Sequence, residues 1–371
     1  MGRHRDTAFS PSFGNRPAQL LGRDGLVGDI VGALDSKPGS KERATVLLGQ
    51  RGYGKTVLLW ELADRARERG LAVANPTAVR EGMLARIVEK LGDDAGRLLR
   101  RQRRAVTGGS VGALGFSAGL SLAGPERRPL SPEGRLERLV RDLSGRGVGT
   151  LLLVDELQAN SAEVRALVST YQELVGEGLD VSMVLAGLPG AVSATLNDRV
   201  LTFLNRARKA SLAELARGEI DAYYKSAFEQ CGVSVPAGLR GAAAEATHGS
   251  PYLMQLVGHY VVVYADGEGN VDEEALEGTL RSARAEFRND VCETTLAALS
   301  RRDVDYLRAM AAASDRGQCR TAEVARRLGV SADYAQQYRR RLIDSGVIRA
   351  VRSGVVAFDV PYLEDHLRGG G

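Results

Sequence analysis

The chain has 371 residues, 44% of them hydrophobic and 26% charged, which is typical of a globular protein with two or three domains. Its most apolar segment, residues 251–265, is too short to span a bilayer and is interrupted by Gln255, Gly258 and His259. The basic residues at the start of the chain are not followed by an apolar stretch, so we expect no secretion, no membrane partner and a cytoplasmic location.

The net charge and the cysteines leave the class of partner open. The formal net charge is +4 and the isoelectric point is about 9.0, which suits a nucleic-acid partner without requiring one. Cys231, Cys292 and Cys319 are far apart in the sequence and have no histidine at metal-ligand spacing. The sequence therefore indicates neither a disulfide framework nor a zinc site, and we expect the three thiols to be buried.

In chain order, the first predicted elements are an irregular arm, a helix, a strand and a second helix. Residues 1–20 lack periodicity, and residues 23–34 have the apolar spacing of a helix. Residues 44–48 are an apolar run that predicts a buried parallel strand, and residues 57–63 again have a helical pattern. The segment between this strand and this helix contains the motif that indicates a function most directly.

The segment from residue 49 to residue 56 matches G-x-x-x-x-G-K-[ST], a phosphate-binding loop. Such a glycine-rich turn at a helix N-terminus offers unpaired backbone N–H groups to phosphate oxygens, and the helix dipole adds positive potential. Lys55 is predicted to reach the β- and γ-phosphates, and the Thr56 hydroxyl is predicted to bind Mg²⁺. The predicted nucleotide-binding residues here are Gly49, Gln50, Arg51, Gly52, Tyr53, Gly54, Lys55, Thr56 and Val57.

Strands and helices continue to alternate after this loop. We predict a strand at residues 71–74 and a long helix at residues 77–104, whose arginines could bind nucleic acid or form a solvated face. Residues 107–124 alternate around glycine, which predicts a β-hairpin, with a flexible loop as the alternative. The alternation of elements predicts a parallel sheet with helices on both faces, and hence an α/β fold.

A second buried strand ends in two acids. After a predicted helix at residues 132–144, residues 151–154 are apolar and are followed by Asp155 and Glu156. Beside a phosphate-binding loop, Asp155 would bind Mg²⁺, and Glu156 would orient and deprotonate the water that attacks the γ-phosphate. An ordinary strand end can show the same pattern, but the phosphate-binding loop favours the catalytic interpretation.

The last part of the chain has the pattern of a small helical module with a β-hairpin. It follows a predicted strand at residues 181–186 and a helical region that extends to about residue 300. Its predicted elements are helices at residues 302–312, 321–328 and 332–345 and hairpin strands at residues 347–351 and 355–360. This order resembles a winged helix-turn-helix.

The third helix of this module has a polar outer face. Ala335, Tyr338 and Leu342 recur at helical spacing and predict its buried side. Glutamine can bind adenine edges and arginine can bind guanine or phosphate, so the opposite side suits a DNA groove. The predicted DNA-binding residues are Gln336, Gln337, Arg340 and Arg341 on the helix and Arg349 and Arg352 on the hairpin. Asp333 and Asp344 weaken this basic face, and the alternative is that the module contacts the nucleotide or a protein partner.

With these motifs, the chain resembles the AAA+/STAND group of P-loop ATPases, particularly members related to archaeal and bacterial origin-recognition proteins. The resemblance implies a five-stranded parallel sheet in the order 5-1-4-3-2. It also implies an ATPase core at residues 21–215, a helical lid at residues 216–299 and a winged helix at residues 300–371. The segment at Gly22 and Arg23 resembles the family's entry motif near the adenine.

Two further residues take their predicted roles from this resemblance. Arg206 is similar in placement to the arginine finger that contacts the γ-phosphate of a neighbouring subunit, and a salt-bridged surface arginine is the alternative. Pro251 is similar to the proline of a G-x-P element in the lid that packs near the adenine and ribose. A proline in the first turn of a helix is also favourable without any ligand.

The chain departs from the family pattern at two places. The strand that ends at residues 186–189 lacks the polar residue that usually senses the γ-phosphate, and the lid lacks a basic residue at its usual sensing position. The resemblance therefore implies ATP and Mg²⁺ as cofactors more directly than it implies turnover. It is also the only indication that favours ATP over GTP.

Two functional hypotheses follow. In the first, the chain is a Mg²⁺-dependent ATPase whose nucleotide state controls its assembly and the engagement of duplex DNA by the winged helix. In the second, it is a STAND-like signalling or defence switch with weak hydrolysis, and its winged helix binds a protein partner. ATP and ADP are ligands in both hypotheses, and a homo-oligomer is compatible with both.

Overall fold

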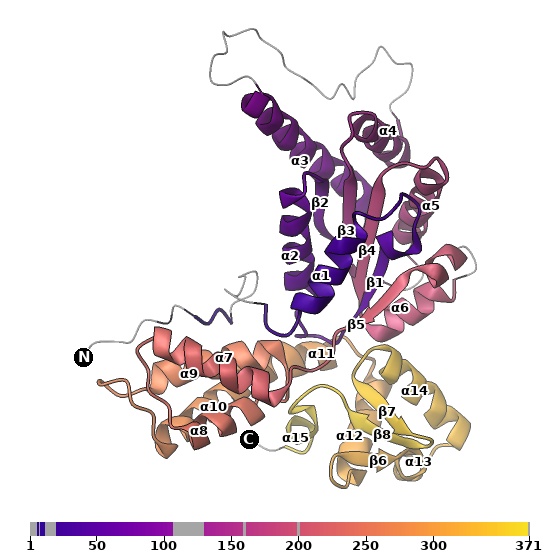
Figure 1. The fold of residues 1–371 in the computed structure, drawn as a ribbon. Helices are drawn as coiled ribbons and strands as arrows, with labels where there is room; N and C mark the ends of the chain where they lie inside the picture. Colours follow the sequence, from indigo (N-terminus) through magenta and orange to yellow (C-terminus); the bar gives the residue numbers. More distant parts are fainter. Residues whose placement is uncertain are drawn as a thin grey trace.

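The computed structural model describes residues 6, 8–11, 20–106, 130–158, 161–198 and 201–369. An α/β part lies at the top of the molecule in Figure 1, with a group of helices and a C-terminal module of helices and short strands beneath it. The predicted glycine-rich hairpin at residues 107–124 lies outside the described residues.

The α/β part is built on one parallel sheet, as predicted. Its strands are β1 (Ala44–Leu48), β2 (Ala72–Ala78), β3 (Thr150–Leu157), β4 (Val181–Gly187) and β5 (Arg208–Ser211). Every strand pair in it is parallel, and the order is β2-β3-β4-β1-β5. Read from the other edge, this is the predicted order 5-1-4-3-2, which is confirmed.

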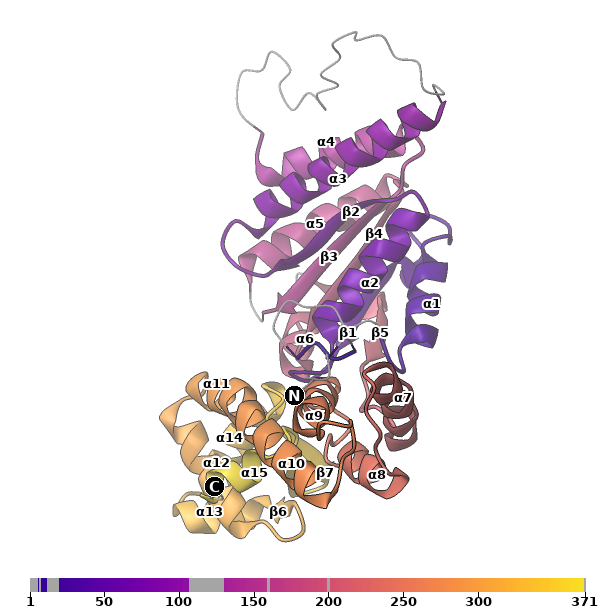
Figure 2. The same cartoon turned by 90° about the vertical axis from the view of Figure 1, so that its left-hand side faces the viewer.

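Helices cover both faces of the sheet (Figure 2). One face is covered by α1 (Asp24–Ala33) and α2 (Lys55–Glu68), and the other by α3 (Met83–Val106), α4 (Pro132–Ser144) and α5 (Ala162–Gly176). Three short elements complete this part: η1 (Lys41–Arg43) before β1, and α6 (Pro189–Leu196) and η2 (Thr202–Arg206) between β4 and β5. Each face has its own apolar cluster, so the central strands are buried on both sides.

The predicted boundary between the second strand and the third helix is wrong. We expected the strand to end at residue 74 and the helix to begin at residue 77, but β2 continues to Ala78 and α3 begins at Met83. Pro76 has no N–H to donate, and the pairing of β2 with β3 shifts register between Ala74 and Thr77, which accommodates it. The Glu163 carboxylate then accepts hydrogen bonds from the N–H groups of Gly82 and Leu84 and fixes the start of α3.

The helical group beneath the sheet forms the region predicted as a lid. It contains α7 (Arg217–Gln230), α8 (Ala237–Glu245), α9 (Pro251–Tyr264), α10 (Glu273–Phe287), the π-helical turn η3 (Arg288–Glu293) and α11 (Thr294–Ala297). Within the described part of the chain, none of the helices combines the length and apolar character needed to cross a bilayer.

The C-terminal module has the predicted succession of three helices and a hairpin. Its elements are α12 (Arg301–Ala313), β6 (Gln318–Arg320), α13 (Thr321–Leu328), α14 (Ala332–Asp344), β7 (Ile348–Arg352), β8 (Val355–Phe358) and α15 (Leu363–Leu367). The strands form an antiparallel sheet in the order β6-β8-β7. Gly329, with a φ of 63°, ends α13, and the Ser331 hydroxyl accepts a hydrogen bond from the Tyr334 N–H to cap α14.

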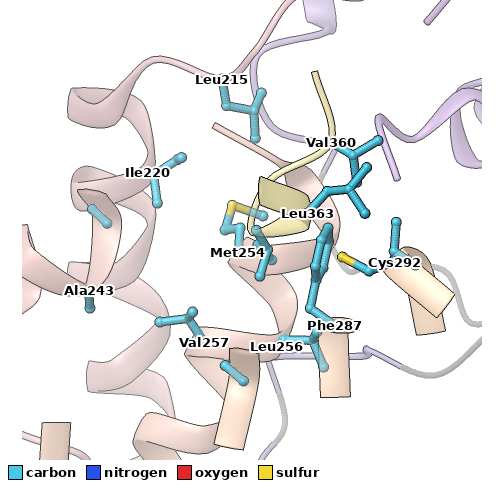
Figure 3. Close-up of a cluster of buried hydrophobic side chains, with 14 of the residues drawn as sticks. Leu215, Ile220, Ala243, Met254, Leu256, Val257, Phe287, Cys292, Val360 and Leu363 are labelled. Atoms are coloured by element: carbon cyan, nitrogen blue, oxygen red, sulfur yellow. The ribbon is translucent and has the colours of Figure 1, made fainter. Parts of the chain in front are cut away.

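The lid and the C-terminal module share one apolar core (Figure 3). Met254 and Leu256 from α9 and Phe287 from the end of α10 belong to the same buried cluster as Val360 and Leu363 near the end of the chain. The three cysteines are buried thiols in this cluster. Because the cluster is continuous, we expect the C-terminal module to move with the lid rather than independently of it.

The C-terminal module also touches the ATPase-like part directly. The end of α14 packs so closely on the start of α6 that a Cβ atom at Gly190 would lie 1.6 Å from the Asp344 carbonyl oxygen. The Gln50 side-chain amide, in the phosphate-binding loop, donates a hydrogen bond to the Asp359 carboxylate just after β8. The loop thus contacts the module on one side.

The described residues of the N-terminal arm are docked on the lid. The Phe9 ring is buried against α7 and lies edge-on to Tyr223. A Cβ atom at Gly258 in α9 would lie 2.1 Å from this ring, so the absence of a side chain there makes room for it. The Ser10 N–H donates to the Gln255 side-chain carbonyl at 2.8 Å. The arm is therefore anchored by contacts with residues more than 200 positions away.

An ion pair between Asp6 and His259 makes this docking sensitive to pH. The His259 Nδ1 atom lies 2.6 Å from the Asp6 carboxylate, and this hydrogen bond, with a smaller contribution from Glu286, raises the pKa of His259 above its usual value of 6.5. While Asp6 is ionised, which its lowered pKa favours, the pair stabilises the folded state fully below about pH 6.5, and this stabilisation is lost as the pH rises through the raised pKa of His259.

We therefore expect Asp6→Asn, which can still accept the N–H hydrogen bonds of Ala8 and Phe9, to lower the thermal unfolding midpoint near pH 6 by about 1–3 °C. The same substitution should have no effect near pH 9, where the imidazole is neutral in both states. Differential scanning fluorimetry across this range measures the difference. An equal effect at both pH values would contradict the role of His259.

Candidate nucleotide-binding site

A cavity of about 810 Å³ lies between the C-terminal ends of the strands and the lid. This is the edge at which open parallel sheets bind ligands. Its wall combines residues of the phosphate-binding loop, the end of β3, the lid and the N-terminal arm. The predicted site residues that line it are Arg23, Arg51, Gly52, Tyr53, Gly54, Lys55, Thr56, Val57, Asp155, Glu156 and Pro251.

The phosphate-binding loop has a backbone shape that depends on glycine. Gly52 and Gly54 have φ values of 78° and 80°, in the left-handed region that other residues rarely adopt. The Lys55 ammonium donates to the carbonyl groups of Gly49 and Gln50, at 2.9 and 2.8 Å. Burial lowers its pKa to about 8, so this cation lies where a phosphate anion would stabilise its charged form.

The donor groups beside this lysine suit a magnesium ion. The Thr56 hydroxyl donates a hydrogen bond to the Asp155 carboxylate at 2.5 Å, although the two residues are 99 positions apart. Asp155 is buried at the end of β3. A hydroxyl and a carboxylate are hard oxygen ligands, and Mg²⁺ prefers such ligands together with phosphate oxygens. The two side chains therefore fit the predicted metal site.

Glu156 reaches the cavity through a distortion of β3. Its φ is 54°, and the pairing of β3 with β4 shifts register between Val154 and Leu157. The Glu156 N–H donates to the Asp155 carboxylate at 2.8 Å, which holds the distorted backbone. Left-handed backbone in a residue other than glycine is strained and concentrates at functional sites. The bulge directs the exposed Glu156 carboxylate into the cavity and leaves Asp155 buried.

The opposite end of the cavity is formed by the start of α1 and the lid. Arg23 is only 8% exposed and donates to the Ala213 carbonyl group. Burial lowers its pKa, against the opposing effect of the Glu219 carboxylate. Pro251 lies in the first turn of α9, where the Ser250 hydroxyl accepts a hydrogen bond from the Leu253 N–H. Arg23 and Pro251 both line the cavity, and their contact with the base and ribose stays a prediction.

Four residues predicted to act at the site do not line the cavity. Gly49 packs against Leu212, and Gly22, with a φ of 65°, packs against Leu215. The Gln50 side chain instead bonds to Asp359 in the C-terminal module. Arg206 is exposed at the end of η2. Its surface position is compatible with contact to another copy of the chain, and this role stays a prediction.

Several cavity residues had no sequence signal of their own. Trp60 lies on α2 and Tyr252 on α9, while Asn289 and Asp290 come from η3. Only Tyr252 lies next to a residue that the motifs identified, namely Pro251. The others reach the cavity through tertiary packing, which local sequence patterns do not encode.

The predicted DNA-binding residues divide into two groups. Gln336 and Arg352 line a groove of about 510 Å³ with Arg320, which sequence reasoning missed, while Gln337 and Arg340 are exposed on α14. By contrast, two of the predicted arginines already have carboxylate partners: Arg341 binds the buried Asp303, with its Nε atom 2.8 Å from the carboxylate, and Arg349 lies 3.4 Å from Asp359.

Two family models match separate parts of the chain. A model described as an AAA ATPase domain matches residues 19–185, which include the loop, Asp155 and Glu156. Residues 19–185 are therefore similar in sequence to AAA ATPase domains. A second model, described as a domain of unknown function (DUF8462), matches residues 289–367, from η3 to α15. No curated protein matches the chain.

Solved structures resemble this chain over nearly its whole length. The Walker-type ATPase PABY2304 of Pyrococcus abyssi has a TM-score of 0.69 at 18% identity, with 95% of this chain and 97% of that chain covered. The ORC2 protein of Aeropyrum pernix, in ADPNP-ADP complexes, has a TM-score of 0.67 at 15% identity, with 97% and 95% covered. Cdc6p from Pyrobaculum aerophilum has a TM-score of 0.54 at 16% identity, also with 97% and 95% covered.

At such low identities these similarities show the fold alone. They confirm the predicted architecture of an AAA+ P-loop ATPase that is similar to origin-recognition proteins.

Proposed function

We propose that this protein is an AAA+ ATPase that binds ATP with Mg²⁺ in the cavity beneath the sheet and hydrolyses it. One observation carries the proposal: Lys55, Thr56, Asp155 and Glu156, from two separate segments of the chain, converge on one cavity. They form a phosphate-binding lysine, a pair of metal ligands and a second carboxylate, which are the groups that phosphoryl transfer to water uses. The ADPNP-ADP complexes of the similar ORC2 protein support a nucleotide in this place.

Each group has a distinct role in this proposal. Lys55 and the loop N–H groups hold the phosphates, and Thr56 and Asp155 hold Mg²⁺, which supplies neutralisation of phosphate charge when bound. Glu156 orients a water molecule and accepts its proton. Arg206 would reach nucleotide bound to a neighbouring copy, so full activity would require an oligomer.

The proposal also assigns duplex DNA to the groove of the C-terminal module, acting as a winged helix. Arg320, Gln336 and Arg352 line this groove, and Arg340 extends the basic surface along α14. Glutamine can contact base edges, while arginines at the groove can contact phosphates or guanine. Since Arg341 binds the buried Asp303, we leave it out of the proposed DNA-binding face.

A signalling switch that binds a protein partner is the second candidate. It is favoured by the hydrogen bond from Gln50 to Asp359, which joins the phosphate-binding loop to the C-terminal module. It is also favoured by Tyr334, an aromatic side chain that is 39% exposed on α14 and packs at a tilt against the Tyr338 ring. Aromatic side chains are enriched at protein interfaces.

The experiment that tests the proposed function is ATP turnover by the purified protein with Mg²⁺, with and without duplex DNA. We expect turnover that DNA increases. ATP binding without turnover in either condition would favour the signalling switch. Failure to bind ATP at all would overturn the proposal.

The DNA assignment makes a separate prediction. We expect Arg340→Ala and Arg352→Ala each to weaken DNA binding about three- to tenfold and to reduce the slope of log affinity against log salt by about one phosphate contact. The matched control is Arg308→Ala, which removes an exposed arginine on α12 outside the groove and should change neither value. Fluorescence anisotropy with labelled duplex at several salt concentrations measures both. If all variants bound DNA with the affinity of the wild type, this face could not be the DNA-binding surface.

A further inference from the structure

The π-helical turn η3 joins the lid to the C-terminal module and also faces the nucleotide cavity. Asn289, Asp290 and Val291 of this turn line the cavity, followed by Thr294 at the start of α11. In both views α11 lies just below the end of the sheet near α6 (Figures 1 and 2). Single π-helical turns next to α-helices occur frequently at functional sites.

Tyr252 places this turn close to the phosphate-binding loop. A Cβ atom at Gly52 of the loop would lie 3.4 Å from the Tyr252 Cβ atom, so the tyrosine begins beside the loop. Its hydroxyl group donates a hydrogen bond to the Asp290 carboxylate. Asp290 is thus one tyrosine side chain away from Gly52, and Asn289 is its neighbour. Asn289 lines the same cavity as Lys55 and Thr56 of the loop.

The chemistry of Asn289 suits recognition of a phosphate. Its side chain is exposed, and within the part of the chain that the structure describes no hydrogen bond holds its amide. An amide is neutral and can donate two N–H bonds to phosphate oxygens, whereas the Asp290 carboxylate would repel them. At the end of β4, where a polar side chain is lacking, the cavity wall is formed by Gly187 and Leu188.

The other side of η3 is attached to the C-terminal module. The Cys292 thiol lies 3.7 Å from the Pro361 carbonyl oxygen, and the His366 imidazole lies 3.0 Å from the Glu293 carboxylate. Cys292 packs in the shared core with Phe287 and Leu363 (Figure 3). If a ligand in the cavity shifted η3, the contacts of η3 with α15 would therefore change as well.

We propose that Asn289 binds the terminal phosphate of ATP and that η3 passes the difference between ATP and ADP to the C-terminal module. The inference rests on the proposed function, because it requires a nucleotide in the cavity. It names the residue that distinguishes triphosphate from diphosphate in a site without a polar side chain at the end of β4. Because η3 contacts both the lid and α15, a movement of η3 on phosphate binding would also move α15.

The test compares the affinities of the purified protein for ADP and for a non-hydrolysable ATP analogue, both with Mg²⁺, by isothermal titration calorimetry. We expect the wild type to prefer the ATP analogue. Asn289→Ala should keep the ADP affinity within about twofold and lose about tenfold or more for the ATP analogue, as for loss of one hydrogen bond to a charged group. Asn289→Asp should lose more, because its charge repels the phosphate.

The matched control is Asn270→Ala, which removes an exposed asparagine of the lid outside the cavity and should leave both affinities unchanged. A second readout is hydrogen exchange of residues 361–367. The ATP analogue and ADP should protect this segment differently in the wild type and equally in Asn289→Ala.

Three results would overturn the inference. A wild-type preference that survives in Asn289→Ala would remove Asn289 from phosphate recognition while leaving the proposed function intact. Equal wild-type affinity for both nucleotides would do the same. Failure of the wild type to bind either nucleotide would overturn the proposed function and this inference together.

Discussion

Replacing Lys55 with alanine is expected to lower the affinity for both ATP and ADP at least about a hundredfold. Lys55 is partly buried at the start of α2, and its ammonium donates to two carbonyl groups of the loop rather than to a carboxylate. Lys55 is a cation in a cavity that Asp155 and Glu156 also line, so removing it would leave the phosphates facing these two acids with less positive charge to attract them. Titration with a fluorescent nucleotide in the presence of Mg²⁺ measures the loss.

The fold should survive this substitution. Burial lowers the pKa of Lys55 to about 8, which means that the folded state without ligand disfavours its charge and does not depend on it. We therefore expect the unfolding midpoint of Lys55→Ala to equal or exceed that of the wild type. Lys225→Ala, an exposed lysine on α7, is the matched control and should bind nucleotide normally. Wild-type affinity in Lys55→Ala would refute the phosphate-binding role.

The phosphate-binding loop could be predicted from the sequence because its conformation depends on residues that are adjacent in the chain. Gly52, Gly54, Lys55 and Thr56 are contiguous, and a strand and a helix flank them. Left-handed glycines and a helix N-terminus are properties of a few neighbouring residues, so the motif specifies its own geometry. The five-stranded sheet order, in contrast, came from the family resemblance, since strand order depends on contacts between distant segments.

The contacts that surround the loop could not be predicted in this way. Gln50 matches an unrestricted position of the motif, and its partner Asp359 is 309 residues away. Phe9 lies in an arm without periodicity, and only the missing side chain at Gly258 makes space for its ring. Neither contact can be predicted from the spacing of hydrophobic residues in the sequence. The boundary of β2 was wrong for a related reason: the bulge that tolerates Pro76 exists only in the pairing with β3.

These distant contacts bear on how the nucleotide state would reach the rest of the protein. The lid and the C-terminal module share a core, and the module contacts both the phosphate-binding loop and α6. A change in the angle of the lid would therefore alter the packing of Gly190 against Asp344. Since packed interfaces tend to have discrete arrangements, we expect such a change to be a switch between defined positions rather than a continuous movement.

In the proposed function turnover depends most directly on Glu156, and we expect Glu156→Gln to lower the rate of ATP hydrolysis by about a hundredfold or more while ATP binding is retained. Glutamine has the same shape and can orient a water molecule, but it cannot accept a proton. The left-handed backbone at this residue is held by the hydrogen bond from its N–H to Asp155, which the substitution leaves in place. Steady-state phosphate release, beside nucleotide titration, separates the two quantities.

The bulge in β3 makes this prediction specific to one of two adjacent acids. Asp155 is buried against Thr56, whereas the exposed Glu156 carboxylate lines the cavity, so Asp155→Asn should weaken the Mg²⁺-dependent part of nucleotide binding as well as turnover. Glu229→Gln, an exposed acid on α7, is the control for general effects of lost charge. If Glu156→Gln turned over ATP at the wild-type rate, the proton acceptor would have to be another group, and the strained backbone at Glu156 would need a different explanation.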